Sequence, residues 1–175
     1  VALDASDAGV HAMLGNLALI QRKSDEALAH CDKALSLNPQ AEALALCGLH
    51  RTYLGAPEES LKLAKRAMWQ SPHYPGWYLF ALGNAHRLLG NYDDAIAAFE
   101  ELAERLPPQS PVPHTVLAFT DMEVGREDDA RAAIAEVLDR QPNFTRTAYS
   151  RTLNYRDPAE RARVLDSLRE AGLPE

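Results

Sequence analysis

The chain has 175 residues, of which 46% are hydrophobic, and its formal net charge is −7. This hydrophobic content is sufficient for a folded core and excludes global disorder. The negative charge argues against nucleic acid and against direct contact with an anionic membrane, because both attract basic surfaces.

The first seven residues match the end of a later helix. Residues 2–5 (ALDA) line up with residues 36–39 (SLNP). We therefore expect residues 1–7 to be the tail of a preceding repeat, with the natural protein continuing upstream of Val1.

Four copies of a two-helix plan follow, and each copy is closed by a proline. The closing prolines lie 33, 35 and 35 residues apart, at Pro39, Pro72, Pro107 and Pro142. A turn glycine, which suits the left-handed residue that ends a helix, recurs between the two helices at Gly55, Gly90 and Gly125, with Arg22 in its place in the first copy. The pattern predicts helices at 8–21 and 25–37, 41–54 and 57–70, 76–89 and 92–105, and 111–124 and 127–140.

The third copy shows the pattern most completely. Leu79, Leu82, Gly83 and His86 fall on one face of its first helix. Gly83 of the first helix and Ala95 of the second helix are small where large residues would be expected. Two helices that cross about 8–10 Å apart need such small contacts.

These copies resemble the tetratricopeptide repeat, whose period is about 34 residues and whose pattern is W-x2-L-G-x2-Y…A-x3-F…P. The pattern's Trp position is held by His11, Leu44, Leu79 and His114, and its Tyr position by Ala18, Arg51, His86 and Asp121. The resemblance implies an all-α fold, a right-handed α-solenoid of stacked antiparallel helix pairs. Within residues 8–142 the units are 8–40, 41–75, 76–110 and 111–143.

The pattern decays after Pro142, and residues 144–171 are expected to form a partial fifth repeat and a capping helix. Residues 144–153 read as one more first helix. Asp157 is a candidate N-cap, followed by proline at the first helical position and an acid at the third. The helix that starts there suits a cap that seals the last repeat.

No constellation of catalytic residues is present, so the chain is expected to have no enzymatic activity and no cofactor. None of the six histidines has a second His or Cys four residues on, which argues against a helical metal site. Cys31 and Cys47 occupy core-facing repeat positions and are predicted to be buried free thiols of a cytoplasmic protein. A redox pair is the alternative.

The resemblance implies a concave groove lined by the first helices, where a protein or peptide would bind. The aromatic residues among the groove positions suit partner capture, and Asn84 and Arg87 suit hydrogen bonds to a peptide backbone or carboxylate. The alternative is that these residues pack between adjacent repeats. The predicted groove residues are Asn16, Leu49, Thr52, Trp77, Phe80, Asn84, Arg87, Phe119, Met122 and Tyr149.

The segments 154–160 (NYRDPAE), 165–175 (LDSLREAGLPE) and 73–78 (HYPGWY) are also similar to the repeat regions of bacterial class III adenylate/guanylate cyclase-type proteins. This narrower resemblance implies a regulatory module of a larger signalling protein, whose partner is a peptide, another domain of the chain or a second copy. The alternatives are a stand-alone adaptor and, third, an accessory that presents a protein substrate to a transferase.

Overall fold

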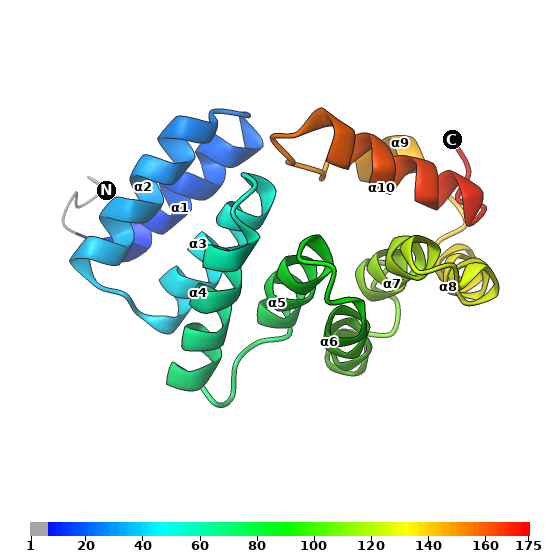
Figure 1. The fold of residues 1–175 in the computed structure, drawn as a ribbon, viewed down its shortest axis with the longest axis horizontal. Helices are drawn as coiled ribbons and strands as arrows, with labels where there is room; N and C mark the ends of the chain where they lie inside the picture. Colours follow the sequence, from blue (N-terminus) through cyan, green and yellow to red (C-terminus); the bar gives the residue numbers. More distant parts are fainter. Residues whose placement is uncertain (1–6) are drawn as a thin grey trace.

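The computed structural model describes residues 7–175 and folds them into ten α-helices (Figure 1). The expectations for residues 1–6 lie outside the described residues. The helices are α1 (Ala8–Ile20), α2 (Ser24–Leu37), α3 (Ala41–Tyr53), α4 (Pro57–Gln70), α5 (Trp77–Leu88), α6 (Tyr92–Arg105), α7 (Val112–Glu123), α8 (Glu127–Arg140), α9 (Arg146–Ser150) and α10 (Pro158–Glu170). The first eight form antiparallel pairs that stack in chain order, which confirms the all-α solenoid.

The turn inside each pair is made by one residue in the left-handed region. The φ angles are 84° at Gly55, 75° at Gly90, 77° at Gly125 and 60° at Arg22. The residue after each of them donates its N–H back across the turn, as in a Schellman motif. These bonds join Lys23 to the carbonyl of Ala18, Ala56 to Arg51, Asn91 to His86 and Arg126 to Asp121, at 2.8–3.0 Å. The predicted turn glycines are confirmed, and Arg22 adopts the same left-handed conformation in the first pair.

Close helix packing within the third pair depends on Gly83. A Cβ atom placed on Gly83 would lie 2.4 Å from Cε1 of Phe99, whose side chain is fully buried. In the fourth pair the equivalent residues are Ala118 and Ile134. In both pairs a small residue of the first helix faces a large residue of the second, and the fourth pair combines a slightly larger small residue with a smaller large one.

The chain changes direction after the fourth pair. The first helix predicted for the fifth repeat is reduced to the short helix α9. Thr145 is the N-cap of α9, and its side chain accepts a hydrogen bond from the N–H of Ala148. The predicted N-cap of α10 is confirmed, because Asp157 accepts from the N–H of Ala159 at 2.9 Å. Helix α10 packs against α7 and α9 and seals the last pair from its concave side (Figure 1).

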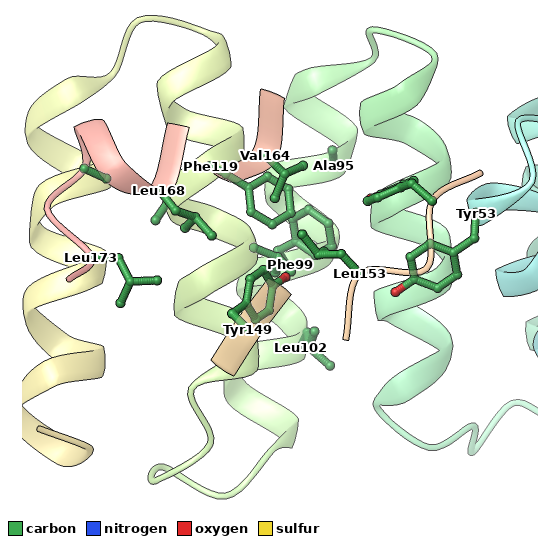
Figure 2. Packing of buried hydrophobic residues seen from close by; sticks show 14 of the residues in the cluster. Tyr53, Ala95, Phe99, Leu102, Phe119, Tyr149, Leu153, Val164, Leu168 and Leu173 are labelled. Atoms are coloured by element: carbon green, nitrogen blue, oxygen red, sulfur yellow. The ribbon is translucent and has the colours of Figure 1, made fainter. Parts of the chain in front are cut away.

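The apolar core continues from the helix pairs into the segment that follows α8. Tyr149, Leu153, Val164 and Leu168 belong to the same buried cluster as Phe99 (Figure 2). The first two pairs have a smaller cluster of their own, in which both cysteines are buried and free, as predicted.

Candidate functional site

The concave face is crossed by the chain's own residues 144–175, which we call the C-terminal segment. It leaves α8, packs across α7, and its loop reaches back to α3 and to the start of α2 (Figure 1). The backbone N–H of Arg156 donates to the carbonyl of Tyr53 at 2.8 Å. The rings of Tyr53 and Tyr155 meet edge to face with centroids 5.0 Å apart. Much of the groove predicted for a partner is thus filled from within.

Arg87 of α5 is the polar centre of this contact, and only 1% of it is exposed. Its Nη1 donates to Oε1 of Glu123 at 2.6 Å, and its Nη2 donates to Oε1 of Glu160 at 2.5 Å. The guanidinium also lies over the Phe119 ring, 4.9 Å from its centroid. Arg87 therefore binds carboxylates as its chemistry suggested, but they come from α7 and α10 of the same chain.

Tyr155 completes the network between α5 and the C-terminal segment. Its hydroxyl accepts from Nη2 of Arg87 at 3.0 Å and donates to Oδ1 of Asn84 at 3.3 Å. The amide nitrogen of Asn84 donates in turn to the carbonyl of Phe80 at 2.8 Å. The Asn84 side chain is therefore held by hydrogen bonds on both its oxygen and its nitrogen.

Burial sets the ionisation of these groups. Desolvation raises the pKa of Glu123, although Arg87 and Arg163 oppose the effect. Desolvation lowers the pKa of Arg87, but Tyr155, Glu123 and Glu160 outweigh it, so the net pKa is raised and the guanidinium stays charged. A charged group in a closed site requires the paired carboxylates, because an unpaired buried charge costs several kcal/mol (roughly 3–5).

An apolar cavity of about 340 Å³ remains beside the network. It lies between α3, α5, the start of α7 and α9, and no charged residue lines it. Its lining residues are Tyr53, Phe80, Pro111, Val112, Phe144, Ala148, Tyr149 and Thr152. Its volume falls in the range of ligand pockets, roughly 300–1,000 Å³.

The ten predicted groove residues separate into several environments. Phe80 and Tyr149 line the cavity, and Asn84, Arg87 and Phe119 lie in the network beside it. Leu49 and Met122 pack at the edge of the main cluster.

The other three predicted residues lie elsewhere. Trp77 packs with Tyr78 and Leu44 against the preceding helix pair. Thr52 is fully buried with its hydroxyl 2.6 Å from that of Ser60, inside one pair. Oδ1 of Asn16 lies 3.4 Å from Nε2 of His50, and this contact joins the first two helix pairs.

Sequence reasoning missed the part of the site that comes from outside the first helices. Tyr53 follows Thr52 by one position, but its role depends on the tyrosine that faces it from the C-terminal segment. Glu123 and Glu160 were not predicted as partners of Arg87. The sequence signal that could have indicated these partners was Arg87 itself, which lies on a largely apolar helix face. A buried arginine must pair with carboxylates, so its position implied acidic partners elsewhere in the chain.

Residues 7–175 hold no group of three or more His, Cys, Asp or Glu arranged to bind a metal ion. Among the described helices, none combines the length and the apolar character that crossing a bilayer requires.

Similarity to known proteins agrees with this architecture. Residues 8–41 and 76–108 match the family model of the tetratricopeptide repeat. No curated protein matches the chain.

Solved structures resemble it over nearly its whole length. The type IV pilus biogenesis factor PilW is similar over 96% of this chain and 74% of its own, with 21% identity and a TM-score of 0.75. The thermophilic TPR protein TTC0263 of Thermus thermophilus is similar over 94% and 86%, with 22% identity and a TM-score of 0.70. YrrB, described as a TPR protein with an unusual peptide-binding site, is similar over 95% and 85%, with 21% identity and a TM-score of 0.61.

These matches agree with the helix pairs and their turns. Two segments of the chain, residues 8–41 and 76–108, are thus similar to the tetratricopeptide repeat, and the chain as a whole has the helical solenoid fold of the solved structures that it resembles.

Proposed function

We propose that this module binds a protein or peptide partner by receiving a large apolar side chain in the cavity between α3, α5, α7 and α9. The observation that carries the proposal is the uncharged lining of that cavity, which lies on the concave face and is large enough for such a group. Apolar pockets with aromatic walls favour aromatic and branched side chains of a partner.

The surroundings of the cavity narrow the class of partner. Arg87 is already paired with Glu123 and Glu160, so it is not free to bind an acidic chain terminus. The similar protein YrrB is described as having a peptide-binding site, which supports a peptide as the ligand class. We therefore propose an apolar peptide segment, supplied by another protein or by another domain.

A filled-cavity variant tests this proposal. Ala148 lines the cavity, and Ala148→Phe would occupy it, whereas Ala132→Phe adds the same ring to an exposed position of α8. Peptides selected from a displayed random library on the unmodified chain should be rich in aromatic and branched residues. These peptides should bind the Ala148→Phe variant at least about tenfold more weakly than the unmodified chain, a loss of roughly 1.4 kcal/mol in binding free energy. They should bind the Ala132→Phe variant as tightly as the unmodified chain. Equal binding to both variants would exclude the cavity as the site.

We further propose that the module is the regulatory part of a larger cytoplasmic bacterial signalling protein such as an adenylate cyclase. The similarity of residues 154–160 and 73–78 to the repeat regions of such proteins supports this, and two buried free thiols fit a reducing compartment. The alternative is a stand-alone adaptor. An antibody raised against residues 8–175 distinguishes them: a native polypeptide much larger than 19.3 kDa that copurifies with cyclase activity supports the first, and a 19.3 kDa polypeptide supports the second.

A further inference from the structure

Two histidines of the first helix pair meet across α1 and α2, which run antiparallel side by side (Figure 1). The Nδ1 atoms of His11 and His30 lie 3.0 Å apart. The ring centroids are 5.3 Å apart and the ring planes are inclined by 36°, so the rings meet through their nitrogen edges and do not stack. Both side chains are half-buried and remain partly exposed to water. Because the pair joins two helices, the spacing of histidines along one helix did not indicate it.

The internal repeats show what these two positions hold elsewhere in the chain. The equivalent residues are Leu44 and Leu63 in the second pair, Leu79 and Ala98 in the third, and His114 and Ala133 in the fourth. The first copy is thus the one of the four that has histidine at both positions. An apolar pair packs without any polar atom to satisfy, whereas each imidazole brings two nitrogens that need partners. Packing of α1 on α2 therefore does not require histidine at either position.

The geometry of the pair suits a metal ion. Neutral imidazole is the commonest metal ligand in proteins and binds through either ring nitrogen. A tetrahedral zinc ion with Zn–N distances of about 2.0–2.1 Å holds two imidazole nitrogens about 3.3–3.4 Å apart. The Nδ1 atoms of His11 and His30 need to separate by only a few tenths of an ångström to reach that spacing. Each ring then carries its proton on Nε2, so that both Nδ1 lone pairs face the ion.

We propose that His11 and His30 form a two-histidine site for a divalent transition-metal ion of the zinc class. Within residues 7–175 no third His, Cys, Asp or Glu is grouped with them, so the described chain supplies two ligands and water supplies the others. Imidazole nitrogen suits zinc, nickel and copper, whereas magnesium and calcium prefer oxygen ligands. One ligand comes from each helix, so the ion links α1 to α2 and stabilises the first pair.

Calorimetric titration of the full chain with Zn²⁺ tests the proposal. The unmodified chain should bind one ion saturably, and Mg²⁺ should not bind. His30→Gln should bind Zn²⁺ at least about tenfold more weakly, since even the loss of a group that only supports a metal ligand costs that much. His114→Gln is the matched control and should bind as the unmodified chain does, because His114 holds the position equivalent to His11 in the fourth pair, where the second position is Ala133. An unmodified chain without saturable Zn²⁺ binding would overturn the proposal, as would equal binding by His30→Gln.

Unfolding in urea tests whether the ion binds the folded pair. Zn²⁺ held by both helices should raise the urea midpoint of the unmodified chain and leave that of His11→Gln unchanged, because a ligand stabilises the state that it binds. Circular dichroism without metal checks that the two chains are compared at equal helical content. A midpoint that rises equally in both chains, or in neither, would overturn the assignment, since zinc would then bind elsewhere or not to the folded chain.

Discussion

The guanidinium of Arg87 in α5 and the carboxylate of Glu160 in α10 lie 2.5 Å apart, although 73 residues separate them in the sequence. The arginine side chain is fully buried, and the glutamate side chain is 11% exposed. This ion pair ties the C-terminal segment to the concave face.

Arg87→Met should be strongly destabilising. It retains most of the apolar volume but removes the buried cation between Glu123 and Glu160, which then keep only the half-exposed Arg163 as a partner. The expected loss in free energy of unfolding is about 3–5 kcal/mol, measured by urea denaturation. Arg105→Met, which breaks a half-exposed pair with Glu101, should cost no more than about 1 kcal/mol.

Removing the charges on both sides should recover part of that loss. In Arg87→Met/Glu123→Gln/Glu160→Gln the buried positions carry no charge and only the half-exposed Arg163 loses its partners, so this triple variant should be more stable than Arg87→Met alone. If the single and triple variants unfold at the same urea concentration, the carboxylates are not what makes the arginine necessary.

The free energy of unfolding should fall in mild acid, because the buried His50 imidazole resists protonation in the folded chain. Desolvation lowers the pKa of this buried imidazole from 6.5 to about 4. The unfolded chain therefore takes up the proton first, so the stability that neutral His50 contributes is present above pH 6.5 and is lost as the pH falls towards 4. The loss amounts to about 3 kcal/mol.

The measurement is urea denaturation at intervals between pH 7 and pH 4, with His50→Gln beside the unmodified chain. The variant should lose less stability over that interval. His73→Gln, which changes an exposed histidine, is the control and should follow the unmodified chain. Parallel curves for His50→Gln and the unmodified chain would contradict the prediction.

Gly83→Ala should destabilise the third helix pair, because the new methyl group would clash with the Phe99 ring. Overpacking of this kind costs about 1–3 kcal/mol, which outweighs the gain of up to about 1 kcal/mol from replacing glycine in a helix. Gly83→Ala/Phe99→Ile copies the alanine–isoleucine combination of the fourth pair and should restore most of the loss. Thermal denaturation checks this, and an unrescued double variant would show that the clash lies elsewhere.

Trp77 and Phe80 should have different roles although both were predicted for the groove. Trp77→Ala should lower stability by roughly 2 kcal/mol, less than for a fully buried tryptophan, because its ring packs on Tyr78 and the preceding pair. Phe80→Ala enlarges the cavity and should weaken peptide binding more than Trp77→Ala does. Calorimetric titration with a library-selected peptide separates the two, and the reverse order would contradict the assignment.

The solenoid was predictable because each helix pair repeats the same local signals. The turn residue, the small residue of the first helix and the closing proline act over a few positions, so the pattern identifies them without knowledge of the rest. Arg22, which stands in the place of the turn glycine in the first copy, adopts the same left-handed conformation as the three glycines. The division into units ending at 40, 75, 110 and 143 stays a prediction.

The contents of the groove were not predictable in the same way. The contacts of Tyr155 with Tyr53 and Arg87 depend on where a non-repeating segment turns after the fourth pair. The repeat pattern of the sequence does not specify the direction in which this segment turns. The fifth first helix is shortened to α9, and α10 after it packs against α7.

The most direct test of a groove closed by the chain's own C-terminal segment is the contact between Tyr53 and Tyr155. A nuclear Overhauser experiment on tyrosine-labelled chain, with Tyr53→Phe and Tyr155→Phe for assignment, should show cross-peaks between the two rings, whose centroids lie 5.0 Å apart. Their absence, together with a Tyr155 ring signal at the position of an unstructured tyrosine, would contradict the account.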